Sequence, residues 1–216
     1  MISTLLSLVG RLALRTAGWR YVHEAPHILR AVVIGAPHTS NWDFPFTVLV
    51  AWSLNVRFRW LGKHSLFDFP FGTFFRVLGG IPVVRHERKD MVSFAASHFE
   101  KYDQLVLLIA AEGTRKRVEY WKSGFYHIAL KAKVPLLLGY FDYKNKVAGF
   151  GPVFYPTGDI KADMDHLRAF YSGIVGDVPE NFGPVRLREE VPVEVEAPAE
   201  ASLQTSGENK LERSSR

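Results

Sequence analysis

Residues 105–111 restrict the fold of this chain more than any other segment. They read Leu-Val-Leu-Leu-Ile-Ala-Ala, seven consecutive apolar residues without the alternation expected of a half-exposed strand. A strand in a parallel sheet has helices packed on both of its faces and is therefore apolar throughout its length. The segment is also short for a helix and of ordinary length for a strand. It predicts a parallel sheet that helices cover on both sides.

Segments of strand type alternate with segments of helix type along most of the chain. The expected strands cover residues 31–35, 56–61, 81–84, 105–111, 134–141 and 147–155. The expected helices cover residues 44–54, 70–78, 89–102, 124–133 and 159–175. This alternation is typical of an α/β fold, and 216 residues suffice for one such domain but not for two ordinary ones. We predict a single α/β domain over residues 21–188, with a mostly parallel sheet flanked by helices.

The N-terminal segment, residues 1–20, predicts an amphipathic helix. One arc of the helix is apolar and holds Ile2, Leu5, Leu6, Val9, Leu12 and Ala13. Another arc is polar and basic and holds Ser3, Ser7, Arg11 and Arg15. Leu8 and Leu14 do not fit this pattern. Such a helix can lie in an anionic membrane interface or pack on the domain. The sequence leaves both possibilities open. It has no run of 18 apolar residues and no signal-peptide pattern, so we expect no transmembrane helix.

The C-terminal segment, residues 189–216, is rich in Pro, Glu, Ala, Ser and Gln and has few large apolar side chains. Such a composition buries too little apolar surface to offset the entropy of ordering, so we expect a disordered tail. The preceding domain is then more basic than the average of the whole chain, in which 27 Lys and Arg stand against 22 Asp and Glu. This balance suits an anionic membrane or a phosphate-bearing substrate.

The absence of cysteine excludes disulfide frameworks, thiolate metal sites and cysteine nucleophiles. No basic run interleaved with aromatic residues is present, so no nucleic-acid partner is expected. His23-Glu-Ala-Pro-His27 matches the letters of a zinc-protease motif, but Pro26 is incompatible with the helix that would place both histidines on one face. We therefore expect no metal. No G-x-S-x-G sequence occurs, which argues against a serine hydrolase of the α/β type.

A histidine and an aspartate lie five residues apart in His38-Thr-Ser-Asn-Trp-Asp43. On a regular helix their side chains diverge by about 140°, and on a strand they point to opposite faces. They can meet where a strand turns into a helix, as it does between residues 31–35 and 44–54. There Asp43 can hold one ring nitrogen of His38 and leave the other free to take a proton from a hydroxyl. The alternative is that Ser40 or Asp43 caps the helix.

Charged or polar residues follow three other predicted strands. In chain order they are Lys63, Arg85 and the run Glu112-Gly113-Thr114-Arg115. Ligands of open α/β sheets bind outside the carboxyl ends of the strands, so these residues are expected to lie near His38. An arginine such as Arg115 can hold a phosphate with two hydrogen bonds. The alternative is a solvated basic turn over residues 115–117.

These segments carry a resemblance to a known family. His38–Asp43 resembles the HxxxxD box of the glycerolipid acyltransferases, the family of 1-acylglycerol-3-phosphate acyltransferases, and Glu112–Arg115 is similar to its EGTR box. Residues 63–85 resemble the block between those boxes, and Val134-Pro-Leu136 resembles the fourth block. The order and spacing agree over about residues 30–157. One short box alone is a weak signal, whereas four boxes in order are a strong one.

The resemblance implies a glycerolipid-acyltransferase-like fold and an acyltransferase that moves a fatty acyl group to the hydroxyl of a lysophospholipid such as 1-acylglycerol-3-phosphate. The donor would be acyl-CoA or acyl-carrier protein, and no metal, cofactor or covalent enzyme intermediate would be needed. His38 would be the general base, with Asp43 as its orienting partner. The acceptor phosphate would bind at the EGTR-like residues and two supporting cations: Glu112, Gly113, Thr114, Arg115, Lys63 and Arg85.

Two positions depart from the family's pattern. Ala111 stands where a proline is common, and Lys116 stands where a serine is frequent. These departures bear on the identity of the acceptor more than on the chemistry. The expected partners are a thioester donor, a lysophospholipid and a membrane surface, and the expected location is the cytoplasm, peripherally on the inner face of the membrane. Two other functions fit the same residues: a thioesterase or lysophospholipase whose base activates water, and a non-catalytic lipid-binding protein.

Overall fold

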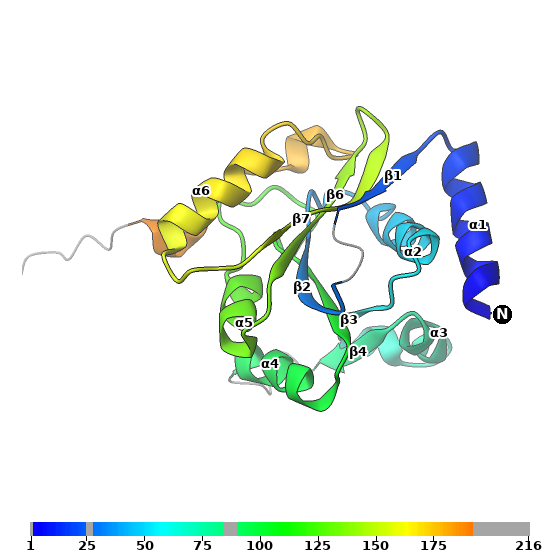
Figure 1. The fold of residues 1–216 in the computed structure, drawn as a ribbon, viewed down its shortest axis with the longest axis horizontal. Helices are drawn as coiled ribbons and strands as arrows, with labels where there is room; N and C mark the ends of the chain where they lie inside the picture. The colour runs from blue at the N-terminus through cyan, green and yellow to red at the C-terminus, as the bar shows by residue number, and fades with distance from the viewer. Residues whose placement is uncertain (1, 25–27, 84–89, 192–216) are drawn as a thin grey trace, which may run out of the picture.

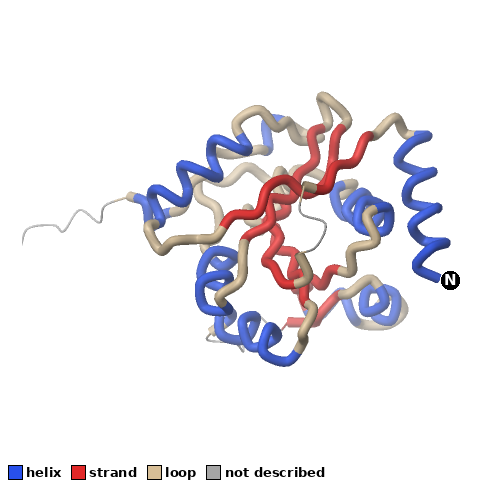
Figure 2. Tube along the Cα trace, in the orientation of Figure 1, coloured by secondary structure: helices blue, strands red, loops and turns tan. Residues whose placement is uncertain are grey.

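The strands expected from the apolar segments assemble into one sheet (Figures 1 and 2). The computed structural model describes residues 2–24, 28–83 and 90–191. In this part of the chain the sheet has seven strands in the order β1-β7-β6-β2-β5-β3-β4. The strands are β1 (Arg20–His23), β2 (Arg30–Gly35), β3 (Phe58–Lys63), β4 (Gly80–Val83), β5 (Leu105–Ala110), β6 (Leu136–Asp142) and β7 (Val147–Phe154). Only β6 and β7 pair antiparallel within this sheet, which confirms the prediction of a mostly parallel sheet.

Helices cover both faces of the sheet (Figure 1). They are α1 (Ile2–Thr16), α2 (Asp43–Ser53), α3 (Gly72–Val77), α4 (Met91–Lys101), α5 (Gly124–Ala132) and α6 (Ile160–Tyr171), with short 3₁₀ helices η1 (His64–Phe67), η2 (Pro179–Asn181) and η3 (Arg188–Glu190). Side chains of α1 and α2 pack on one face, and side chains of α4, α5 and α6 pack on the other. The predicted single α/β domain is therefore confirmed.

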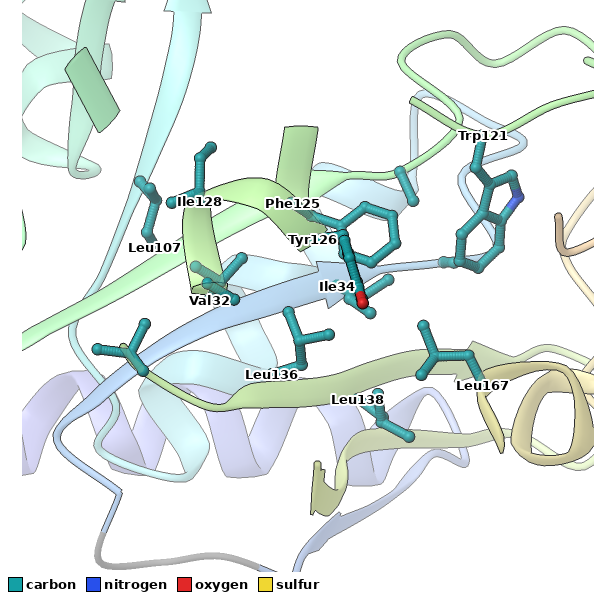
Figure 3. Packing of buried hydrophobic residues seen from close by; sticks show 14 of the residues in the cluster. Val32, Ile34, Leu107, Trp121, Phe125, Tyr126, Ile128, Leu136, Leu138 and Leu167 are labelled. Carbon is teal, nitrogen blue, oxygen red and sulfur yellow. The ribbon is translucent and has the colours of Figure 1, made fainter. Parts of the chain in front are cut away.

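Alternate residues of the central strands pack on opposite faces of the sheet. Val32 and Ile34 of β2 belong to the large cluster beneath α4, α5 and α6, where Figure 3 shows them beside Leu136 and Phe125. Ala31 and Val33 lie in a separate cluster on the other face. Because both faces of β2 are covered, each position from 31 to 34 needs an apolar side chain.

Two regions were not expected from the sequence. The edge strand β1 pairs in parallel with β7, and none of its four residues is fully buried. After α6, residues 172–191 run along the loops at the carboxyl edge of the sheet. There the Val178 N–H donates to Thr39 Oγ1 at 3.2 Å, and the Tyr143 N–H donates to the Val175 carbonyl at 2.9 Å. Neither β1 nor the segment 172–191 contains a long apolar run, because each of them contacts the domain along an edge of the sheet.

The N-terminal helix uses two faces. Leu14 is fully buried, and Gly10 lies directly against α2, where an added Cβ would stand 2.7 Å from the Leu49 carbonyl oxygen. A second face exposes four large apolar residues: Leu5, Leu8, Val9 and Leu12. Leu14, which did not fit the predicted apolar arc, is therefore the residue that anchors α1 to the domain. None of the described helices is long and apolar enough to cross a bilayer.

The tail was expected to start at residue 189. The structure shows that Glu190 still belongs to η3 and forms a 2.9 Å ion pair with Arg168 of α6. The Leu187 N–H donates to the other Glu190 oxygen at 2.6 Å. Residues 192–216 lie outside the described part of the chain.

Candidate active site

The predicted site residues follow strands that share one edge of the sheet. His38 follows β2, Glu112 follows β5, and Lys63 is the last residue of β3. These strands are parallel, so their carboxyl ends point the same way. The crossovers after β2 and β5 leave these adjacent strands in opposite directions, toward β3 and β6 respectively. Ligands of open α/β sheets bind at such a point.

The side chains of His38 and Asp43 meet at this edge. The Nδ1 atom of His38 lies 3.1 Å from Oδ2 of Asp43, because the chain leaves β2 in a loop and begins α2 at the aspartate. The N–H groups of Thr39 and Ser40 donate to the same carboxylate oxygen at 2.8 and 2.9 Å. The five-residue spacing thus forms a closed loop around one carboxylate, as expected where a strand turns into a helix.

Asp43 is buried, yet it is held in its ionised form. Burial alone opposes ionisation, but hydrogen bonds from His38, the Ser40 N–H and the Tyr143 hydroxyl together hold the pKa of the carboxyl below its usual value. An ionised carboxylate only accepts hydrogen bonds, so the His38 Nδ1 must carry the hydrogen that it shares with Asp43. The lone pair of the neutral ring is then on Nε2. The His38 side chain is 25% exposed, which leaves the ring accessible.

Glu112 differs in burial from the residues that follow it in the predicted phosphate site, Gly113, Thr114 and Arg115, which are exposed. It is only 1% exposed, and both of its carboxylate oxygens lie 3.1 Å from the backbone nitrogen of His38, which donates to them. Burial raises the pKa of Glu112 to about 7, although the His38 N–H partly offsets this. The Glu112 carboxyl therefore supports the loop from His38 to Asp43 by accepting the His38 N–H.

The rest of the predicted phosphate site forms an exposed turn. Gly113 has a φ of +68°, a conformation that glycine adopts without steric cost, and its N–H donates to the Ala110 carbonyl at 3.0 Å. The Thr114 hydroxyl accepts a weak 3.3 Å bond from the Lys116 N–H. Arg115 is exposed, and no ion pair ties it to an acid of the described residues. Its guanidinium is therefore available for an external anion.

The two predicted supporting cations are Lys63 and Arg85. Lys63 is exposed at the end of β3, two strands away from β2 in the sheet. Arg85 lies outside the described residues. The structure therefore brings His38, Asp43 and Glu112 into direct contact and places Lys63 at the same edge.

Sequence reasoning missed Tyr143, which follows β6 on the other side of β2. Its hydroxyl donates to Oδ1 of Asp43 at 2.8 Å, so both oxygens of that carboxylate are occupied. The ring packs edge-on against Trp19 at 5.0 Å and against Phe46 at 6.1 Å. Burial and the neighbouring Asp43 charge raise the pKa of Tyr143, so it remains a hydrogen-bond donor. No local signal could have found it, because 100 residues separate it from Asp43.

The described residues contain no group of three or more His, Asp or Glu side chains arranged to hold a metal ion. The first histidine of the HExxH-like segment, His23, lies in the edge strand β1. The second, His27, falls outside the described residues. The groups that the structure places at this edge include an oriented imidazole after β2 and an exposed turn with cations after the neighbouring strand β5.

Comparison with known families agrees with this geometry. A sequence model of the family described as Acyltransferase matches residues 20–137, which is more than half of the 216-residue chain. The chain belongs to the Acyltransferase family. The match includes β1 to β5, the His38–Asp43 loop and the turn that carries Glu112 and Arg115. No match was found among curated proteins.

A solved structure shares the fold. The chain is similar to the crystal structure of the 1-acyl-sn-glycerophosphate (LPA) acyltransferase PlsC from Thermotoga maritima, with a TM-score of 0.56 and 16% sequence identity. The similarity covers 80% of this chain and 78% of the other. At this level of identity the likeness establishes the fold alone. The predicted glycerolipid-acyltransferase-like architecture is thereby confirmed.

Proposed function

We propose that this acyltransferase moves a fatty acyl group from a thioester, carried by CoA or acyl-carrier protein, to the hydroxyl of a lysophospholipid such as 1-acylglycerol-3-phosphate. The observation that carries the proposal is the 3.1 Å contact between His38 and the buried, ionised Asp43, on a ring that is itself accessible. Membership of the Acyltransferase family supports the same chemistry.

In the proposed reaction His38 acts as the general base. Its Nε2 takes the proton of the acceptor hydroxyl while the hydroxyl oxygen attacks the thioester carbonyl. The tetrahedral intermediate then expels the thiolate, which takes the proton from the imidazolium, so an ester forms and a C–S bond breaks. Asp43 favours the imidazolium and keeps Nε2 directed outward. Such a base contributes about 10²–10⁴ to the rate.

The acceptor phosphate is proposed to bind at the exposed turn after β5. Arg115 supplies a planar donor that can hold two phosphate oxygens at once. The Gly113 backbone and the Thr114 hydroxyl lie in the same turn, and Lys63 and Arg85 are the proposed supporting cations. We assign Glu112 to the support of the histidine loop, because its carboxylate accepts from the His38 N–H. No metal or cofactor is needed for this chemistry.

We also propose that the protein works in the cytoplasm at the inner face of the membrane, where its lipid substrates reside. The exposed face of α1 supports this, because Leu5, Leu8 and Leu12 are each between 58% and 65% exposed to solvent. The helix carries Arg11 and Arg15 and no acidic residue. An apolar face with a basic flank is typical of a helix that lies in an anionic interface.

The test is a coupled assay with purified protein, a long-chain acyl-CoA or acyl-carrier protein, and 1-acylglycerol-3-phosphate. We expect release of the free thiol carrier together with a diacylated product. His38→Ala should remove both. His166→Ala, which alters a histidine of α6 that stacks on Phe154 of β7, serves as the control and should keep full activity. Normal turnover by a folded His38→Ala protein would contradict the mechanism.

Product analysis separates the alternatives. Free fatty acid without a diacylated product would show that the base activates water, as in a thioesterase or lysophospholipase. Vesicle binding without turnover on any acceptor would identify a lipid-binding protein. A panel of lysolipids that differ only in the headgroup then tests the phosphate site, because Arg115 should favour acceptors that carry a phosphate monoester.

A further inference from the structure

A second exposed apolar surface lies in the segment between β3 and β4, which begins directly after Lys63. Five large side chains make up this surface, which we call the α3 patch: Leu66, Phe69, Phe71, Phe74 and Val77. Phe69 is 97% exposed and Val77 is 79% exposed. Contiguous apolar groups on a protein surface mark an interaction site more often than isolated ones do.

The α3 patch is held outward by a tightly packed base. Phe67 is buried beneath it and contacts Trp60 and Phe75 at ring distances of 5.8 and 6.3 Å. A Cβ added to Gly72 would stand 1.9 Å from the Phe67 carbonyl oxygen, and one added to Gly80 would stand 2.7 Å from the Phe67 ring. The chain therefore needs glycine at both positions to close around Phe67. The exposed aromatic residues project from a fixed support.

Most charges in the segment that carries the patch are positive. Residues 54–83 contain four cations, Arg57, Arg59, Lys63 and Arg76, against one acid, Asp68. Helix α3 also lies at the same end of the molecule as α1, opposite α6 (Figure 1). The exposed face of α1 has the same character, with apolar side chains and no acidic residue. Two basic, apolar surfaces at one end complement a partner that is apolar inside and anionic at its surface.

From this we infer that the α3 patch inserts into an anionic phospholipid bilayer and forms a second membrane contact beside α1. A second copy of the chain is a poorer occupant, because a two-fold interface would set the same cations against each other. The inference shares its membrane setting with the proposed function. Its test measures binding alone, so that loss of acyl transfer leaves it standing.

The test is sedimentation of the full chain with phosphatidylcholine vesicles, with and without phosphatidylglycerol. The triple variant Phe69→Ser, Phe71→Ser, Val77→Ser should bind the anionic vesicles about tenfold more weakly or worse. Serine suits position 71, which is the N-cap of α3, so the helix is expected to survive. The matched control Tyr155→Ser removes another exposed aromatic residue, which lies between β7 and α6, and should bind like the wild type.

A second measurement avoids any effect of the triple variant on folding. The chain has no cysteine, so Val77→Cys and Tyr155→Cys each give a single site for an environment-sensitive dye. Anionic vesicles should shift the emission of the dye at position 77 to the blue and leave the dye at position 155 unchanged. Equal responses at the two positions, unchanged binding by the triple variant, or dimers that the triple substitution dissociates without lipid would each overturn the inference.

Discussion

The His38 loop and the Gly113–Arg117 turn lie at neighbouring strand ends but are built in opposite ways. In the loop, one buried carboxylate accepts hydrogen bonds from His38, Thr39, Ser40 and Tyr143, and a second buried carboxylate accepts from the His38 N–H. The turn is exposed, and the Arg115 guanidinium has no acidic partner among the described residues. One segment is fixed before any substrate arrives, and the other is left open for an anion.

This contrast suits the two tasks that we propose. A general base must be oriented in advance, since misplacement lowers the rate of proton transfer steeply. A cationic side chain binds an anion most strongly when no acidic group of the protein has already neutralised its charge. Substitutions in the loop should therefore change kcat, while substitutions in the turn should change KM. The predictions below test this division, from the largest expected effect to the smallest.

Asp43→Asn should lower kcat by about 10²–10⁴ and leave KM nearly unchanged, because the amide no longer fixes the His38 tautomer or stabilises the imidazolium. Steady-state kinetics measure both constants. The control is Asp142→Asn, which alters a carboxylate at the end of β6 that bonds to Asn145. An unchanged kcat in Asp43→Asn would show that the pair does not act in the reaction.

Glu112→Gln should change how stability depends on pH. Burial raises the pKa of Glu112 from 4.5 to about 7, so between these values the folded protein binds more protons than the unfolded chain. The contribution of the wild-type carboxyl is therefore fully present below its unfolded pKa and is lost as the pH rises through 7. Relative to Glu112→Gln, the wild type should lose about 3 kcal/mol of unfolding free energy from acid to mild alkali. Denaturant titrations across this range test it, and parallel curves would contradict it.

Arg115→Ala should raise KM for a phosphorylated acceptor by about 10- to 100-fold, the value of one or two charge-assisted hydrogen bonds, with little change in kcat. Arg115→Lys should recover only part of the loss, because an ammonium cannot form the planar two-fold contact. Lys101→Ala removes an exposed cation at the end of α4, before β5 begins, and controls for net charge. A fall confined to kcat would place Arg115 in the chemical step instead.

Tyr143→Phe should lower kcat by about fivefold, which corresponds to the loss of one hydrogen bond of about 1 kcal/mol to Asp43. The ring packing against Trp19 is kept by phenylalanine, so the melting temperature should change little. The pH profile of kcat should also shift, which a purely structural substitution would not cause. Tyr155→Phe, at an exposed tyrosine, is the control.

Much of the site could be predicted from the sequence because its parts are local. His38 and Asp43 lie five residues apart across a strand-to-helix turn, and the chain geometry alone brings them together. The apolar run at residues 105–111 required a parallel strand covered on both faces, and β5 occupies it. The turn over residues 112–115 could be predicted because it comes directly after this strand. In each case the information lies within about ten consecutive residues.

What only the tertiary structure decided depends on contacts between distant segments. The sequence motif predicted that Glu112 binds a ligand. In the structure Glu112 is buried and accepts the N–H of His38, which lies 74 residues away in the chain. The two meet because β2 and β5 are neighbours in the sheet. Tyr143 reaches Asp43 because β6 lies on the other side of β2. The exposure of the Phe69 side chain depends on how the chain packs around the buried Phe67. Sequence patterns specify which face of an element is apolar, whereas strand order decides which side chains become neighbours.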